Sequence, residues 1–168
     1  MSRFAEPVFI AEGLRTPFGR GGGALANYDA ASLSVPVVQE MAKLAEPDLT
    51  IWGTVIPNLG WSNIAREIWL DGKLNPNVPA FSVVLACSTS MTASFAAAGM
   101  LGGGLNLILV GGSEVMSRPS LALTAEASKR LTDLFAQDPA AALAALGALT
   151  PQDYVLPTKG WANRLTGR

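Results

Sequence analysis

The stretch between Lys73 and Glu114 carries no charged residue, and this feature limits the folds open to the chain most strongly. Within it, residues 91–112 form an apolar run that is long enough to cross a bilayer. However, glycines 102–104 interrupt this run in its middle, and residues 105–110 read as a short buried strand. We therefore expect a helix, a glycine turn and a strand inside a folded core, and no transmembrane segment.

Composition restricts the class of protein further. The 168 residues are 49% apolar and 15% charged, which suits one folded domain with a buried core and argues against disorder. The net charge is −1, and the basic residues are scattered along the chain apart from the pair at 129–130. Neither feature gives a reason to expect a nucleic-acid partner. The single cysteine excludes an internal disulfide, and residues 1–7 lack the apolar core of a secretory signal peptide. We therefore expect a cytoplasmic, reducing location and no bound metal.

Strand-like and helix-like segments alternate along the chain, and this alternation predicts an α/β fold. Asp29 is expected to cap a helix that runs to about residue 46, in which Pro36 predicts a kink or a later start. Asn63 is expected to cap a second helix that closes at Gly72. The other expected elements are strands over residues 7–11, 51–57, 81–86 and 105–110, helices over 88–101, 121–135 and 138–149, and a loop over 151–168.

Cys87 is the residue whose surroundings point most directly to chemistry. It follows the strand expected over 81–86 and precedes the helix expected over 88–101. A thiol at a helix N-terminus faces unpaired backbone N–H groups and the positive end of the helix dipole, which favour the thiolate. The same N–H groups can bind a carbonyl oxygen as it becomes negative. By its position alone, Cys87 also fits a small buried hydrophobe, which is the commoner role of a free cysteine.

Three motifs occur in order along the chain. Arg-Thr-Pro-Phe-Gly at residues 15–19 follows the first expected strand. Residues 63–66 and 77–80 lead to the strand that ends in Cys87-Ser-Thr-Ser, and Gly-Gly-Ser-Glu-Val-Met-Ser at 111–117 follows the next strand. In their order and spacing these segments resemble the thiolase family. The resemblance extends from the first expected strand to the end of the chain.

The resemblance implies a fold and a division into domains. Residues 1–117 resemble the thiolase N-terminal α/β domain, with a mixed sheet and a buried helix after the nucleophilic cysteine. Residues 118–168 resemble the beginning of the loop domain, which covers the active site and contacts coenzyme A in that family. Residues 128–134 look most like the thiolases of fatty-acid β-oxidation complexes, and residues 163–168 resemble the middle of the loop domain.

The activity that the resemblance implies is acyl-CoA C-acyl transfer, as in a 3-ketoacyl-CoA thiolase. Cys87 would attack the 3-keto carbonyl, acetyl-CoA would leave, and a second coenzyme A would collect the shortened acyl chain. Acyl-CoA and coenzyme A are then substrates, and no separate cofactor is implied. In the family a histidine activates the nucleophile, and a second cysteine carries the proton to and from the substrate carbon.

The chain departs from the family pattern because it contains no histidine and no second cysteine. It is therefore expected to be a piece of a longer thiolase, one half of an enzyme completed by a partner chain, or a non-catalytic thiolase-like assembly subunit. A β-ketoacyl synthase-type condensing enzyme is a further alternative because residues 86–90 also resemble its cysteine region, although residues 15–17 favour a thiolase. Thiolases are dimers or tetramers, so a homo-oligomer is expected. The chain is also expected to be unstable alone, because a large apolar surface would stay exposed.

Other residues of these segments have more than one interpretation. Arg15 fits a phosphate contact or a hydrogen-bonded turn, and glycines 21–23 lack the lysine and the spacing of a phosphate-binding loop. Glycines 111–112 fit close backbone packing. Met116 fits an acyl pocket or, more commonly, a core position. The basic pair at 129–130 fits contact with coenzyme A phosphates, a membrane surface or only water.

Overall fold

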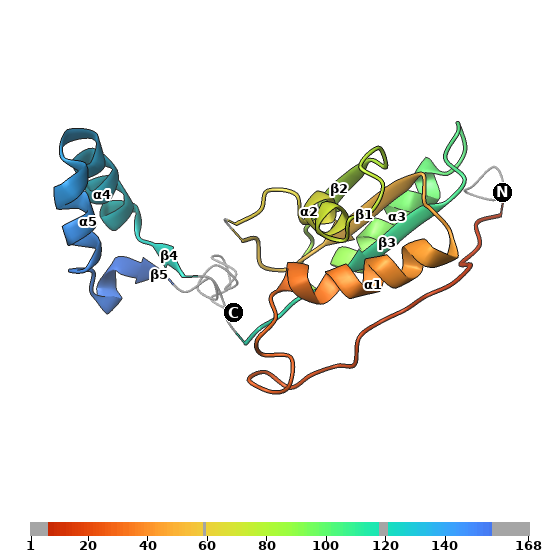
Figure 1. Cartoon of the computed structure of the whole chain (residues 1–168), viewed down its shortest axis with the longest axis horizontal. Coiled ribbons are helices and arrows are strands. Elements are labelled where there is room, and N and C mark those ends of the chain that lie inside the picture. Colours follow the sequence, from red (N-terminus) through yellow and green to blue (C-terminus); the bar gives the residue numbers. More distant parts are fainter. Residues whose placement is uncertain (1–6, 59, 118–120, 156–168) are drawn as a thin grey trace, which may run out of the picture. The chain divides into compact units, whose positions relative to one another are not determined.

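The computed structural model describes residues 7–58, 60–117 and 121–155. It divides the chain into two compact units, which we call unit 1 (Met1–Arg118) and unit 2 (Pro119–Arg168). The described elements of unit 1 are, in chain order, α1 (Ala30–Leu44), β1 (Leu49–Gly53), α2 (Ile64–Asp71), β2 (Ala80–Val83), α3 (Thr89–Met100) and β3 (Ile108–Gly112) (Figure 1).

The strand β1 lies at the centre of a three-stranded sheet with the order β2-β1-β3. It pairs in parallel with both neighbours, so that Ile51 lies opposite Phe81 on one side and Val110 on the other. All five residues of β1 are buried, whereas those of β2 and nearly all of those of β3 are half-buried. The parallel pairing, joined to alternating helices, confirms the predicted α/β class.

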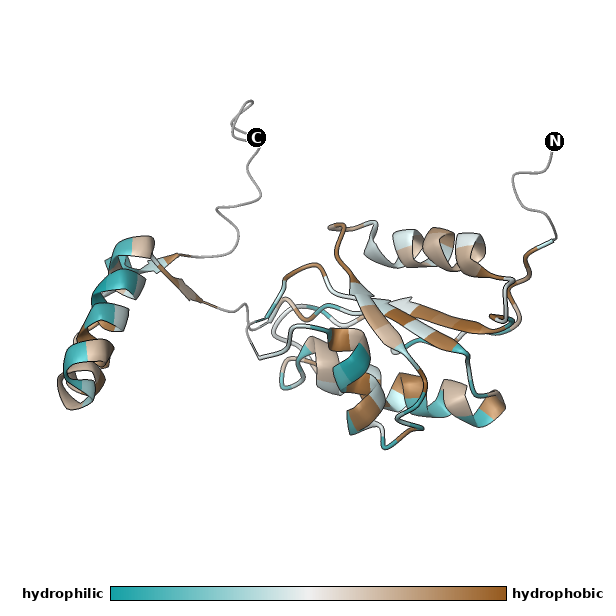
Figure 2. Cartoon of the chain, turned by 90° about the horizontal axis from the view of Figure 1, so that it is seen from above, coloured by the Kyte–Doolittle hydropathy of each residue, from teal (hydrophilic) through white to brown (hydrophobic). Residues whose placement is uncertain are grey.

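Helices cover both faces of this sheet. Trp52 belongs to the core formed with α1 and α2, together with Val38 and Ile68. Its neighbour Ile51 belongs to a second core on the opposite face, with Ala93 of α3. In Figure 2 the largely brown strands lie between the helices. Successive residues of one strand thus serve two separate apolar cores.

The helix ends follow from capping residues. Asp29 accepts a hydrogen bond from the N–H of Ser32, and the Ser32 side chain bonds back to the Asp29 backbone, which confirms the predicted N-cap. The helix α1 begins directly after Asp29 and continues through Pro36, so the later start is wrong. Asn63 caps α2, and Gly72 follows its last residue, as predicted.

The predicted strands differ from the observed ones mainly at their ends. The strand predicted over 51–57 ends at Gly53, four residues before its predicted end. The strand predicted over 81–86 ends at Val83. The strand predicted to stop before Gly111 continues to Gly112, because the parallel register with β1 carries the pairing to that residue. Strand ends depend on pairing between distant segments, which local sequence does not report.

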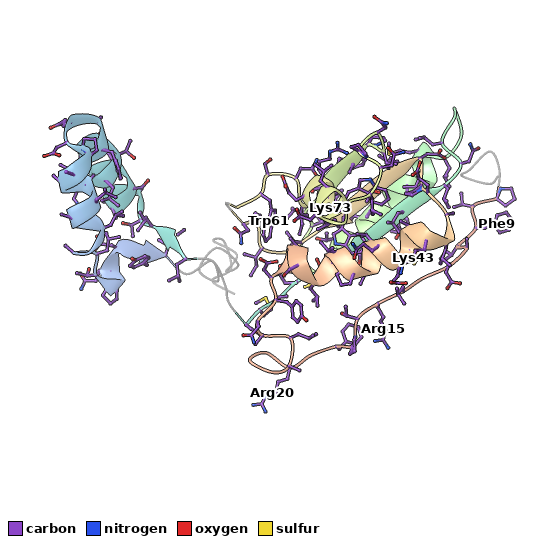
Figure 3. All side chains as sticks on the ribbon, viewed as in Figure 1. Phe9, Arg15, Arg20, Lys43, Trp61 and Lys73 are labelled. Carbon is purple, nitrogen blue, oxygen red and sulfur yellow. The ribbon has the colours of Figure 1, made fainter. Side chains whose placement is uncertain are left out.

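The buried strand predicted over residues 7–11 is wrong. These residues are extended but belong to no sheet in the described part of the chain, and Phe9 and Ile10 are 81% and 97% exposed. Figure 3 shows Phe9 in this segment, with its side chain turned away from the layers of unit 1. On its side of the sheet β3 is the outermost described strand, and no described backbone hydrogen bond joins residues 7–11 to it.

The described part of unit 2 contains two α-helices, a 3-10 turn and a short antiparallel ribbon. Asp138 caps the second helix with Pro139 at its first position, as predicted. The tail predicted as loop forms a 3-10 turn and a short strand before residue 156, and residues 156–168 lie outside the described part. The elements of unit 2 are β4 (Ala122–Leu123), α4 (Ala125–Gln137), α5 (Pro139–Leu146), η1 (Pro151–Asp153) and β5 (Tyr154–Val155).

The basic pair in the second turn of α4 makes ion pairs within unit 2. Lys129 pairs with Asp133 one turn away, and the Arg130 guanidinium lies 3.0 Å from a carboxylate oxygen of Asp153. Hydrogen bonds from Thr150 and the Arg130 guanidinium hold the pKa of Asp153 below its usual range. Both basic side chains are more than half exposed, so these pairs contribute little to stability.

Gly111 allows β3 to approach the ring of Trp52. The two residues lie opposite each other in the parallel ladder, and a methyl group on Gly111 would overlap the Trp52 ring. The interpretation of Gly111 as a close-packing residue is therefore confirmed.

We expect Gly111→Ala to lower the free energy of unfolding by about 1–3 kcal/mol, because the added methyl group forces the Trp52 ring or the β3 backbone to move. Urea denaturation followed by Trp fluorescence measures the change. Gly99→Ala is the matched control, because Gly99 lies in α3 with open space around it. That control should raise stability by about 0.5–1 kcal/mol, and an equal loss in both variants would contradict the packing explanation.

The Asp48 carboxylate fixes the turn that leads into β3. It accepts hydrogen bonds from the backbone N–H groups of Asn106 and Leu107, at 2.7 and 3.0 Å. These bonds hold the pKa of Asp48 below its ordinary value. The folded pKa is thus lower than the unfolded one, so the carboxylate stabilises the fold above the ordinary aspartate pKa. This contribution is lost as pH falls through the lowered folded pKa.

Asp48→Asn should therefore be less stable than the native chain at pH 7. The two proteins should converge in stability as the medium is acidified below the folded pKa of Asp48. Denaturant midpoints measured from pH 7 to pH 2 check this, and a stability difference that stays constant over that range would contradict it.

Candidate active site

Cys87 lies in a sharp turn between a strand and a helix. The strand β2 ends at Val83, α3 begins at Thr89, and the Cys87 side chain is exposed. Ala86, directly before it, has a φ of 46°, one of two positive values among the described residues other than glycine. A side-chain-bearing residue adopts this conformation at a cost of about 1–3 kcal/mol, and such strain concentrates at functional sites.

The Thr89 hydroxyl holds this turn in place. It accepts a hydrogen bond from the N–H of Leu85 and donates one to the carbonyl oxygen of Ala86, each at 2.8 Å. Thr89 is buried, and a methyl group on Gly53 of β1 would overlap its methyl group. The absence of a side chain at Gly53 therefore lets Thr89 sit against the sheet and clamp the turn that carries Cys87.

The N-terminus of α3 adds an electrostatic element to the turn. The N-cap residue Ser88 makes no side-chain capping bond, and the N–H groups of Ser90 and Met91 donate to no described residue. Unpaired N–H groups at a helix start carry partial positive charge, which favours a developing oxyanion. The predicted position of Cys87 just before a helix N-terminus is thus confirmed. The alternative of a buried cysteine is wrong, because Cys87 is exposed.

Glu114 holds a second loop at the same end of the sheet. One of its carboxylate oxygens accepts hydrogen bonds from the Thr54 hydroxyl and from the N–H groups of Val55 and Ile56, at 2.7–3.0 Å. These bonds fix the loop after β1, which explains why the predicted strand over 51–57 ends early. The loops after β1, β2 and β3 all leave the carboxyl ends of parallel strands, which is the edge where open α/β sheets bind ligands.

A buried polar cluster joins β1, β3 and α1 behind this edge. The Trp52 indole N–H lies 3.1 Å from the Ser34 hydroxyl and 3.3 Å from the Ser113 hydroxyl. Both hydroxyls also donate to the carbonyl oxygen of Ala30. Because every partner here is internal, the cluster is structural and positions the residues that follow β3.

The other motif residues have structural or surface positions. The Arg15 guanidinium donates to the carbonyl oxygen of Thr16 and lies 5.1 Å from the centre of the Phe18 ring, which confirms the hydrogen-bonded turn. Met116 is 48% exposed, so its interpretation as a core residue is wrong. Ser117 accepts a hydrogen bond from the N–H of Gly22 and ties the third motif to glycines 21–23.

Sequence reasoning missed Thr89 and the role of Glu114. The signal for Thr89 was a threonine two residues after the cysteine at a helix start, where hydroxyls bond to nearby backbone groups. The signal for Glu114 was a lone carboxylate directly after an apolar strand. Across the described ranges, His, Cys, Asp and Glu side chains form no group of three that could hold a metal ion.

Comparison with known proteins places this geometry in a family. Residues 8–146 match the family model for the thiolase N-terminal domain. The chain belongs to the thiolase family. In the 3-ketoacyl-CoA thiolase of Vibrio cholerae, 37% of 122 aligned residues are identical, covering 69% of this chain and 28% of that protein. An acetyl-CoA acetyltransferase of Synechocystis is 33% identical over 147 residues, covering 78% of this chain and 37% of that protein.

A solved structure agrees with this assignment. The crystal structure of the Bacillus anthracis acetyl-CoA acetyltransferase superposes with a TM-score of 0.63 at 33% identity, covering 67% of this chain and 30% of that one. The chain therefore spans only about a third of the length of these thiolases. That residues 118–168 begin a thiolase loop domain stays a prediction. No helix in the described part is long and apolar enough to span a membrane.

Thr89→Val should lower the free energy of unfolding by about 1–3 kcal/mol, because it keeps the side-chain shape but leaves the Leu85 N–H without its acceptor. Thr89→Ser keeps the hydroxyl and is the matched control, with a smaller loss from one missing methyl group. Chemical denaturation of both variants checks this. Equal destabilisation by the two substitutions would show that the hydroxyl does not hold the turn.

Proposed function

We propose that the chain is the nucleophile-bearing part of an acyl-CoA C-acyltransferase of the 3-ketoacyl-CoA thiolase type, acting only within a longer or composite protein. Cys87 is its acyl-thioester nucleophile. The observation that supports this best is the exposed thiol on a strained turn, at the N-terminus of α3, in a chain of the thiolase family. The relatives named 3-ketoacyl-CoA thiolase and acetyl-CoA acetyltransferase support acyl-CoA as the substrate class.

The proposed chemistry proceeds in two transfers. The Cys87 thiolate attacks the C3 carbonyl carbon of a 3-ketoacyl-CoA, and the bond between C2 and C3 breaks. Its electron pair takes a proton at C2, which releases acetyl-CoA and leaves an acyl thioester on Cys87. The thiolate of a second coenzyme A then attacks this thioester, takes the acyl chain and restores the Cys87 thiolate. No separate cofactor is needed, because coenzyme A thioesters are the substrates.

The described groups of this chain supply two of the parts that such chemistry needs. The turn presents the thiol, and the unpaired N–H groups of Ser90 and Met91 at the start of α3 are donors for a developing oxyanion. The exposed side chains of Val84, Leu85 and Met91 lie within four residues of Cys87 in the sequence and offer apolar contact for an acyl chain. The proton carriers must come from elsewhere, because the chain has no histidine and no second cysteine. We propose that the remainder of the enzyme provides them, in the cytoplasm and as an oligomer.

The test is mass spectrometry of the protein isolated from its source, under native conditions and after addition of acetyl-CoA. We expect an additional polypeptide in the complex and an acetyl group on Cys87, which trypsin digestion locates. A Cys87→Ala variant in the same assembly should stay unmodified. If the assembled native protein takes up no acetyl group while Cys87 is reduced and exposed, the catalytic proposal is wrong.

The missing histidine favours a second candidate, a non-catalytic assembly subunit of a thiolase. In that case the assembly should turn over acyl-CoA with Cys87→Ala as fast as with the native chain. The β-ketoacyl synthase alternative differs in its acyl donor. Labelling of Cys87 by acyl carrier protein thioesters and not by coenzyme A thioesters would support it over a thiolase.

A further inference from the structure

The peptide bond between Ala86 and Cys87 is held in place by one buried residue. The Ala86 carbonyl oxygen accepts two hydrogen bonds from Thr89, one from the hydroxyl at 2.8 Å and one from the backbone N–H at 3.2 Å. Thr89 is only 4% exposed, and its hydroxyl accepts a further hydrogen bond from the N–H of Leu85. A threonine hydroxyl has a single hydrogen to donate, and here that hydrogen goes to Ala86.

This arrangement also fixes the direction of the Cys87 N–H group. A trans peptide bond is planar, so its C=O and N–H groups point in opposite directions. Since the Ala86 C=O group points at Thr89, the Cys87 N–H points away from Thr89. It donates to no described residue, and the Cys87 side chain is exposed. The sulfur and a free hydrogen-bond donor therefore belong to the same residue.

The turn by itself would also allow the opposite orientation of this peptide. The Ser88 N–H donates to the carbonyl oxygen of Leu85 at 3.0 Å and closes a four-residue turn. Ala86 and Cys87 are its two central residues. Such turns occur in pairs of forms that share the closing bond and differ by a half rotation of the central peptide. The bond from the Thr89 hydroxyl is made in only one of the two forms, so it selects the form that is present.

The strain in the turn is concentrated on the same peptide. Ala86 has a φ of 46°, which is unfavourable for a residue with a side chain. A strained conformation of this kind persists only where surrounding contacts hold it, and here those contacts come from Thr89, whose methyl group fills the space above Gly53. The fold thus retains an unfavourable backbone conformation at the one peptide whose N–H belongs to the cysteine.

We propose that Thr89 is a positioning residue for the acyl transfer at Cys87, in which its hydroxyl keeps the Cys87 N–H directed toward the carbonyl oxygen under attack. When the S–C bond forms, the electron pair of the C=O double bond moves onto that oxygen, and the N–H donates a hydrogen bond to the oxyanion. The pair returns when the leaving group departs. The inference rests on the proposed function and adds to it a residue that acts only through the backbone of Cys87.

Two reagents with different transition states test the proposal on the native protein isolated from its source. 4-Nitrophenyl acetate acylates a thiolate through an oxyanion and releases 4-nitrophenolate, whereas iodoacetamide alkylates it at a saturated carbon, releases iodide and forms no oxyanion. Neither reaction needs recognition of coenzyme A. The measured quantity is the ratio of the acylation rate to the alkylation rate at Cys87. Both rates are taken on the plateau of the pH profile, so that a change in thiol ionisation does not enter the ratio.

A matched set of variants made in the same host separates positioning from stability. Thr89→Val keeps the side-chain shape without the hydroxyl, and it should lower the ratio at least about tenfold, because a misdirected N–H no longer stabilises the oxyanion. Thr89→Ser keeps the hydroxyl and should return the ratio close to the native value. Val38→Ala removes buried volume from the core on the other face of the sheet, so it should lower stability and leave the ratio unchanged.

Three results would overturn the proposal. The first is a ratio that Thr89→Val leaves unchanged, whether both rates fall together or neither falls. The second is an equal fall of the ratio in Thr89→Val and Thr89→Ser, which assigns the effect to the methyl group. The third is a native Cys87 that 4-nitrophenyl acetate does not acylate. The proposed function fails separately: if the ratio depends on the Thr89 hydroxyl while acetyl-CoA leaves Cys87 unmodified, the positioning role holds and the thiolase activity does not.

Discussion

The sizes of two adjacent residues in β1 control how the layers of unit 1 fit together. Trp52 fills the space under α1 and α2, and Gly53 leaves the opposite face empty. The Trp52 ring leaves room only for a glycine, Gly111, beside it in β3. The missing side chain at Gly53 leaves room for Thr89 of α3. A larger side chain at Gly53 or at the glycine opposite Trp52 would push a neighbouring helix or strand away from the sheet, because packed interiors accommodate added volume poorly.

The candidate site depends on this packing, although Cys87 itself is exposed. Thr89 can reach the backbone on both sides of Ala86 only because it lies flat against Gly53. The left-handed conformation of Ala86 is stabilised by this contact and in turn places the cysteine in front of the first turn of α3. The position of the thiol therefore follows from a missing side chain in the central strand, one layer below it.

Local chemistry explains what the sequence could predict. The caps at Asp29, Asn63 and Asp138 involve residues three positions apart or fewer, so their side chains report them directly. The setting of Cys87 was likewise visible, because a strand, a cysteine and a run of small residues follow one another. The positive φ of Ala86 was not visible, since it depends on Thr89 and Gly53 together. Strand ends could not be predicted either, because they also depend on residues that are distant in the sequence. The strand predicted over residues 7–11 was wrong because an apolar sequence indicates a need for burial but not the presence of a neighbouring strand.

The unpaired state of residues 7–19 also bears on how the chain is made. This segment leaves the ribosome before any element of the sheet, and β3 is translated only after α2, β2 and α3. Because residues 7–19 pair with no described strand even in the folded chain, this apolar segment stays uncovered during synthesis as well. Extended apolar segments of this kind are targets for chaperones and for aggregation. Covering this segment therefore protects the chain from aggregation, which the strength of the finished sheet alone does not do.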